Sequence, residues 1–189
     1  MRINAFYHLN HISGRDFRPD WRSLRQFGSE DKIRRYLTDQ GIDRIVLLED
    51  FIGSGDQMKK AVEFAVTFGM PVLVVPRVIC PIGAQVGPLL SSQNPTVTFS
   101  PVISLQEAAF ITAVARPNEE PLFDELRLIA IDMFNGLPAD EQVDVYTAFG
   151  FRGTGSLVVM YTNCPDNTLP LVHHNSAAWK PLFPRASRL

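Results

Sequence analysis

The sequence is poor in three features that would each point to a particular class of protein. Its 18 Lys and Arg stand against 20 Asp and Glu, so it lacks a basic excess, and direct nucleic-acid binding is not indicated. No apolar run reaches the roughly 18 residues of a membrane helix, so we expect no membrane partner. The N-terminal stretch MRINAFYHLNHISGRDF has no apolar core of a signal peptide, which predicts a cytoplasmic protein.

Cysteine is scarce as well, because the chain has only Cys80 and Cys164. Two cysteines cannot build the disulfide framework of a small secreted domain, and a reducing compartment disfavours a bond between them. We therefore expect two buried, reduced thiols. A chain of 189 residues needs no such cross-link, because a domain of this size buries roughly 70% of its unfolded surface.

Apolar runs and helical patterns alternate along the chain. Strands are predicted for RIVLL (44–48), MPVLVVPRVIC (70–80), TVTFSPVI (96–103) and SLVVMYT (156–162). Helices are predicted for residues 29–41, 56–68, 105–115 and 120–134, whereas PIGAQVGPLLSSQNP (81–95) has the composition of a loop. We expect RIVLL to be buried on both faces, as in a parallel sheet, and Pro76 to lie near a strand end or at a sheet edge.

This order of elements predicts an α/β fold, with a mostly parallel sheet flanked by helices and right-handed crossovers. We expect residues 1–28 to form an N-terminal segment and residues 29–189 to form the α/β domain. In such sheets, ligands bind beyond the carboxyl ends of the strands. Two polar stretches, EDFIGSG and NCPDNT, follow predicted strands and are therefore candidate binding segments.

The stretch IVLLEDFIGSGDQ (45–57) places Glu49 and Asp50 directly before a turn of small residues and a helical pattern. Glycines let the N–H groups of such a turn approach a ligand, and the helix adds its positive end, so the turn suits a phosphate. Carboxylates beside a phosphate would repel it unless sugar hydroxyls or Mg²⁺ lie between them. The arrangement therefore suits a ribose 5-phosphate, with the acids on the 2- and 3-hydroxyls.

Two other phosphate-binding patterns do not fit this stretch. A Walker A loop requires Gly-Lys followed by Ser or Thr, and that sequence does not occur in the chain. The Rossmann fingerprint has three glycines and an acid about twenty residues later, whereas the acids precede the glycines here.

The same stretch resembles the motif by which type I phosphoribosyltransferases bind 5-phosphoribosyl 1-pyrophosphate (PRPP): a hydrophobic strand, two acids, two apolar residues and a short phosphate loop. The resemblance implies a type I phosphoribosyltransferase-like, Rossmann-like fold that binds PRPP or another nucleotide containing ribose 5-phosphate. It implies that Glu49 and Asp50 are the catalytic residues, which hold the ribose hydroxyls and contact a Mg²⁺ cofactor indirectly. It also implies that the 5-phosphate is wrapped by Gly53, Ser54, Gly55, Asp56 and Gln57.

The C-terminal part, GFRGTGSLVVMYTNCPDNTLPLVHHNSAAWKPLFPR (150–185), is similar to the tail of the PRTase-CE-like proteins, a phosphoribosyltransferase-like family of bacterial conflict and anti-phage systems. That tail has the pattern N-x-P-x-N-T-L-P, followed by W-x-P-L-F-x-R. The resemblance implies a role in anti-phage defence and a protein partner in a defence system. Its polar residues Asn163, Asp166 and Asn167 form either a turn that satisfies its own backbone or a loop on the acceptor side of the site.

Three functions remain open at this point. The chain is an enzyme that transfers a phosphoribosyl group to an unidentified acceptor, a catalytically silent module that senses PRPP or a nucleotide, or a toxin-like effector or subunit of a larger defence complex. Two departures from the type I pattern bear on the choice. Gln57 stands where Thr or Ser is usual, and residues 1–44 leave little room for the pyrophosphate loop and the hood loop. A late start of the chain, a partner that completes the site, or loss of the pyrophosphate chemistry would each explain the second departure.

Overall fold

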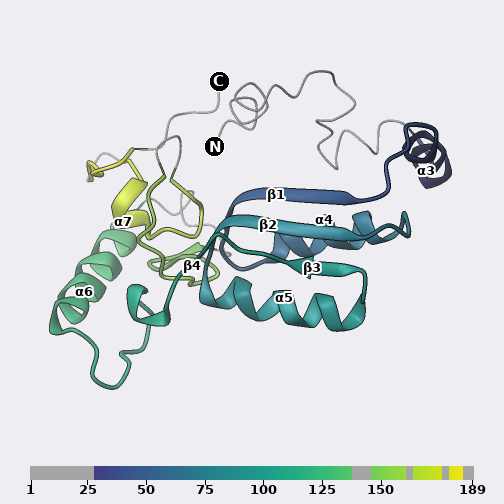
Figure 1. Cartoon of the computed structure of the whole chain (residues 1–189). Coiled ribbons are helices and arrows are strands. Elements are labelled where there is room, and N and C mark those ends of the chain that lie inside the picture. Colours follow the sequence, from purple (N-terminus) through teal and green to yellow (C-terminus); the bar gives the residue numbers. More distant parts are fainter. Residues whose placement is uncertain (1–27, 138–145, 161–163, 176–178, 185–189) are drawn as a thin grey trace. The chain divides into compact units, whose positions relative to one another are not determined.

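The computed structural model describes residues 28–137, 146–160, 164–175 and 179–184 (Figure 1). The chain divides into two units, and each is described by itself. The first unit comprises Met1–Ile79 and Gly83–Ser104, and the second comprises Cys80–Ile82 and Leu105–Leu189. Within the described residues, no helix is both long enough and apolar enough to cross a membrane.

The first unit contains a parallel sheet of four strands. These are β1 (Ile45–Ile52), β2 (Val72–Ile79), β3 (Val97–Phe99) and β4 (Ile103–Ser104). β1 pairs along the whole of β2, whose other side pairs first with β3 and then with β4. Three of the predicted strand runs therefore build this sheet, and the prediction of an α/β fold with a mostly parallel sheet is confirmed.

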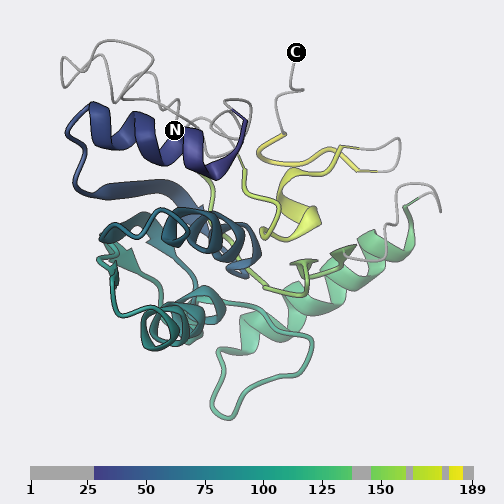
Figure 2. The same ribbon diagram turned by 90° about the vertical axis from the view of Figure 1, so that its right-hand side faces the viewer.

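The two crossover helices of the first unit lie on the same face of its sheet. α4 (Asp56–Val66) connects β1 to β2, and α5 (Pro81–Gln93) connects β2 to β3. Right-handed crossovers between neighbouring strands taken in order put successive helices on one side, and Figures 1 and 2 show both helices there. The core between helices and strands includes Met58, Val62, Ala65, Val72, Val74, Leu90 and Val97.

The opposite side of the sheet, which we call the open face, carries Val46, Leu48, Asp50, Leu73, Val75 and Arg77. Side chains alternate along a strand, and exposure alternates with them along β2 as far as Val78. In β2, Val72 and Val74 are buried, whereas Leu73 between them is 37% exposed, and Val46 in β1 is 48% exposed. The prediction that the first strand is buried on both faces is therefore wrong. Both crossover helices cover the same face of the sheet, and neither covers the open face.

Pro76 lies within the central strand β2, so its predicted position near a strand end or at a sheet edge is wrong. Its carbonyl accepts the N–H of Val102, and the carbonyl of Val74 accepts the N–H of Ser100, each at 2.9 Å. The nitrogen of Pro76 also faces the side of β2 on which β3 and β4 pair. It lies between the last residue paired with β3 and the first residue paired with β4. The missing N–H therefore removes no bond from the ladder with β1, which is why proline is tolerated there.

α5 forms where the sequence predicts a loop at residues 81–95. The helix contains two prolines and two glycines, which are the poorest helix formers. The glycines lie four residues apart, on the face that meets the sheet. A Cβ at Gly83 would lie 2.7 Å from the carbonyl oxygen of Gly53, and one at Gly87 would lie 3.3 Å from the ring of Phe99. Close packing of the helix backbone on the sheet has therefore outweighed the local propensity of these residues.

α3 (Glu30–Asp39) precedes the sheet and confirms the helix predicted from residue 29. Ser29 occupies the N-cap position, but its side chain makes no capping hydrogen bond. The helix buries Ile33 and Leu37 against Phe64 and Phe68, whose rings meet edge to face with centroids 5.0 Å apart. This cluster holds α3 against the C-terminal half of α4, at the end of the unit where β1 begins.

The second unit is built from one long helix and several short elements. α6 (Pro121–Asn135) confirms the helix predicted for residues 120–134. The other elements are η2 (Glu107–Ala109), β5 (Tyr146–Thr147), β6 (Gly150–Phe151) and α7 (Pro170–His173), of which β5 and β6 form an antiparallel hairpin. A separate core of Ile111, Ala130, Ala148, Phe149 and Leu169 lies among them.

Two elements predicted for the second unit do not form as expected. A helix is predicted for residues 105–115, but η2 is one short turn there, because the N–H of Ile111 donates to the distant carbonyl of Gly155 at 2.9 Å. A strand is predicted for residues 156–162, but its described part, 156–160, forms no strand and contains isolated bridges, one of which joins Ser156 to Thr168. Both departures come from backbone contacts between segments far apart in the sequence.

A network of charged side chains joins the chain before α6 to the helix itself. Arg127 is buried, and its guanidinium pairs with Glu119 and Asp124 and donates to the carbonyl of Thr112 at 2.7 Å. Arg116 pairs with the other carboxylate oxygen of Glu119 at 3.0 Å. Burial raises the pKa of Glu119, but the hydrogen bonds and charges of Arg127 and Arg116 outweigh it and leave this pKa below its usual value.

This network predicts a pH dependence of stability. Because the pKa of Glu119 is lowered by folding, its stabilisation is complete above its unfolded pKa of about 4.3 and is lost as the pH falls through the lower folded value. We expect Glu119→Gln to unfold at a lower temperature than the wild type at neutral pH, and to lose less stability between about pH 5 and about pH 3. Thermal unfolding followed by circular dichroism at several pH values measures this, and parallel curves for the two proteins would contradict it.

Candidate functional site

The five residues predicted to bind a phosphate form one turn between β1 and α4. Gly55 is the N-cap of α4 and has φ +87°, a left-handed conformation that glycine adopts without strain. Gly53 and Gly55 are buried, whereas Ser54 and Asp56 are half-buried and Gln57 is exposed. The turn therefore leads from the carboxyl end of a parallel strand directly to the positive end of an eleven-residue helix.

α5 packs against this turn, which the sequence did not indicate. A Cβ at Gly83 would meet the carbonyl oxygen of Gly53, and a Cβ at Gly55 would lie 3.1 Å from Cγ2 of Val86. Gly83 and Val86 therefore determine how closely the turn approaches the helix. The only sequence signal was the spacing of Gly83 and Gly87, which fits the close approach of one helical face to a neighbour.

The polar groups of the turn bind one another. The hydroxyl of Ser54 donates to Oδ2 of Asp56 at 3.3 Å, and the N–H of Asp56 points to Oγ of Ser54 at 3.5 Å. A phosphate at this turn would have to replace both interactions in order to use the Ser54 hydroxyl and the Asp56 amide. It would also meet the negative charge of Asp56, which stands in the first turn of α4.

Glu49 and Asp50 both lie within β1, near its carboxyl end and three residues or fewer from the turn. The pairing of β1 with β2 keeps one offset from Ile45↔Val72 to Ile52↔Ile79, so side chains alternate along β1 as far as its last residues, where Ile52 turns into the core beneath α4 and α5. The two carboxylates therefore leave the strand on opposite sides. Asp50 belongs to the open face, and Glu49 belongs to the face of α4 and α5.

The residues present fit Mg²⁺ only if the ligand supplies most of the coordination. No group of three or more His, Cys, Asp and Glu side chains that could hold a metal ion occurs among the described residues. Two adjacent carboxylates that leave a strand on opposite sides are also poorly placed to coordinate one metal ion together. Mg²⁺ is commonly held by one or two carboxylates together with substrate phosphates and water, and Glu49 or Asp50 could take that part.

The predicted acceptor-side loop belongs to the second unit, and Asn163 lies outside the described residues. The side-chain amide of Asn167 donates to Oγ1 of Thr154 at 2.9 Å and reaches the carbonyl of Phe151 at 3.5 Å. The carbonyl of Asp166 accepts the N–H of Phe151 at 3.0 Å. These bonds tie the loop to the hairpin of β5 and β6. A further role of Asp166 or Asn167 in contacting an acceptor stays a prediction.

Neither Cys80 nor Cys164 forms a disulfide bond, and both are buried, as expected. Burial raises the pKa of Cys80 to about 12, and the hydrogen bond with Ser156 offsets only part of this effect. Burial therefore favours the protonated thiol, and the fully buried Cys80 packs in the interior.

Comparison with known proteins supports the two resemblances found in the sequence. The model of the PRTase-CE family matches residues 4–185, which is nearly the whole chain and includes both the turn at 53–57 and the C-terminal tail. No curated protein and no solved structure matches the chain. The chain therefore belongs to the PRTase-CE family and is a phosphoribosyltransferase-like protein.

Proposed function

We propose that the first unit binds PRPP together with Mg²⁺ and transfers its phosphoribosyl group to an acceptor. The observation that carries this proposal is the connection from β1 to α4, in which two acids in the last half of the strand are followed by buried glycines at a helix N-terminus. The family membership supports the same ligand class. Glu49 and Asp50 would accept hydrogen bonds from the ribose hydroxyls, and the turn would bind the 5-phosphate.

The turn offers enough donors for useful affinity. Binding with a micromolar dissociation constant requires about 8 kcal/mol. A charge-assisted hydrogen bond contributes roughly 1.5–3 kcal/mol, and the dipole of α4 adds about 0.3–2 kcal/mol. Four backbone N–H groups of residues 53–57, each near the middle of that range, would contribute about 9 kcal/mol, which leaves a small surplus for separating Ser54 from Asp56.

The proposed transfer breaks the bond between C1 of the ribose and the pyrophosphate oxygen, which leaves with the electron pair. The acceptor forms a new bond to C1 and loses a proton. Positive charge develops on the ribose during this step, and the carboxylates of Glu49 and Asp50 would stabilise it through the hydroxyls that they hold. When bound, Mg²⁺ would neutralise charge on the leaving pyrophosphate.

A second candidate is a catalytically silent module that senses PRPP or a nucleotide. The hydrogen bond between Ser54 and Asp56 favours the sensing module. A ligand must break this bond before it can use the Ser54 hydroxyl, so binding would change the structure of the turn. The similarity of the C-terminal tail to proteins of anti-phage systems suggests that either activity would serve a defence complex with a protein partner. Turnover distinguishes the enzyme from the sensor, and copurification of a partner tests the complex.

Calorimetric titration of the full chain with PRPP and Mg²⁺ tests the proposal, with ribose 5-phosphate and AMP as further ligands. We expect micromolar binding of PRPP and weaker binding of ribose 5-phosphate, because the latter lacks the pyrophosphate. A coupled assay for released pyrophosphate, with a panel of bases and amines as acceptors, then tests transfer. If none of the three ligands binds, the proposed function is wrong.

A further inference from the structure

One charged side chain stands on the open face beside the candidate site. Arg77 is the only charged residue in the strand β2, whose sequence is VLVVPRVI, and it is exposed. Charged side chains often protect the edge of a sheet, but β2 is the central strand of this one. The position therefore calls for another explanation of the charge.

The register places Arg77 next to Asp50. Glu49 pairs with Pro76 and Phe51 with Val78, so Arg77 lies opposite Asp50 on the neighbouring strand. Neighbouring strands are about 4.8 Å apart, and both side chains leave on the open face. Among the residues that the structure describes, Arg77 makes no hydrogen bond or ion pair with a partner, so its guanidinium is available to a ligand.

We propose that Arg77 binds the pyrophosphate group of PRPP, and this inference rests on the proposed function. If the turn at 53–57 holds the 5-phosphate and Asp50 holds a ribose hydroxyl, the group on C1 points away from the turn. The pyrophosphate is the only other anion of this ligand. A guanidinium binds phosphate oxygens through two parallel hydrogen bonds, and it can reach them from a position one strand away from Asp50.

This role answers a question that the sequence left open. The sequence does not identify which residues bind the pyrophosphate, and a cation on β2 would do so without a separate pyrophosphate-binding loop. Arg77 would also offset the negative charge of Asp50 while both contact the same ligand. It would act as a determinant of specificity that separates PRPP from ribose 5-phosphate.

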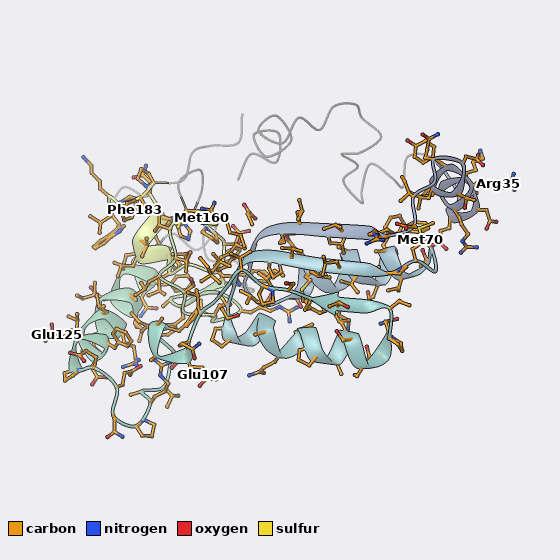
Figure 3. All side chains as sticks on the ribbon, in the orientation of Figure 1. Arg35, Met70, Glu107, Glu125, Met160 and Phe183 are labelled. Carbon is orange, nitrogen blue, oxygen red and sulfur yellow. The ribbon has the colours of Figure 1, made fainter. Side chains whose placement is uncertain are left out.

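The test compares the two ligands on matched variants by calorimetry in the presence of Mg²⁺. Arg77→Gln should weaken PRPP binding at least tenfold and leave ribose 5-phosphate within about twofold. Arg77→Lys, which keeps the charge but loses the two parallel bonds, should fall between Arg77→Gln and the wild type. Arg35→Gln is the matched control, since Arg35 is an exposed arginine on α3 of the same unit (Figure 3) and should change neither affinity.

The outcomes separate this inference from the function on which it rests. If wild type and Arg77→Gln bind PRPP equally well, Arg77 is not a ligand of the pyrophosphate and the proposed function still stands. If Arg77→Gln weakens both ligands equally, the assignment to the pyrophosphate is wrong. If the folded wild type binds neither ligand, the proposed function is overturned and this inference falls with it.

Discussion

Replacing Glu49 with Gln and Asp50 with Asn is expected to remove detectable binding of PRPP while leaving the fold intact. Each carboxylate would lose a charge-assisted hydrogen bond to a ribose hydroxyl, which contributes roughly 1.5–3 kcal/mol. Losing both would weaken binding by at least about 3 kcal/mol, or more than a hundredfold. Calorimetry measures the affinity, and circular dichroism with thermal unfolding checks the fold.

The single variants of these two acids carry additional information. We expect each single substitution to weaken binding by roughly 1.5–3 kcal/mol, or at least about tenfold, because each removes one hydrogen bond to a ribose hydroxyl. Glu63→Gln is the matched control, since Glu63 is an exposed acid on α4 that pairs only weakly with Lys59, at 3.8 Å. If a folded double variant bound PRPP as tightly as the wild type, the two acids would have no part in the site.

Replacing Gly155 with Ala is expected to destabilise the second unit severely. Gly155 has φ +70°, and a Cβ there would overlap the carbonyl oxygen of Ile111 and lie 2.8 Å from its carbonyl carbon. The left-handed conformation costs an alanine about 1–2 kcal/mol, and forcing the segments apart costs about 1–3 kcal/mol more. The same movement would break the hydrogen bond from Ile111 to Gly155. We expect a total loss of roughly 3–5 kcal/mol in the free energy of unfolding.

Gly153→Ala separates the two causes of this loss. Gly153 has a similar φ of +63°, but among the described residues a Cβ there would find only Oγ1 of Thr147, at 3.8 Å. It should lose about 1–2 kcal/mol, from the backbone conformation alone. Urea unfolding of the two variants measures the difference, and equal losses would show that the close approach of Gly155 to Ile111 does not matter for stability.

The strand and turn of the candidate site could be predicted from the sequence because their signals are local. The apolar run at the start of β1, the glycines at 53 and 55 and the helical pattern from Asp56 each act over a few residues. The helices α3, α4 and α6 follow from apolar periodicity for the same reason. The amino-acid sequence alone therefore identifies the five residues of the turn, although their affinity for a phosphate stays a prediction.

α5 and the segment at 105–115 could not be predicted, because distant contacts outweighed local preference there. Glycines and prolines at 81–95 indicate a loop, but two of those glycines let a helix approach the sheet more closely than any other residue would. An apolar stretch at 105–115 indicates a helix, but Ile111 bonds to Gly155 instead. In both cases the deciding atoms are far away in the sequence.

The chemistry of the candidate site divides in the same way. Which residues stand in it is a property of the sequence, since Glu49, Asp50 and the turn follow one another along the chain. The pairing of β1 with β2 determines which side of the sheet each carboxylate takes. The same pairing places Arg77 beside Asp50. That pairing is a contact between strands separated by a whole helix. Burial of the core beneath α4 and α5 determines its register, which no local pattern encodes.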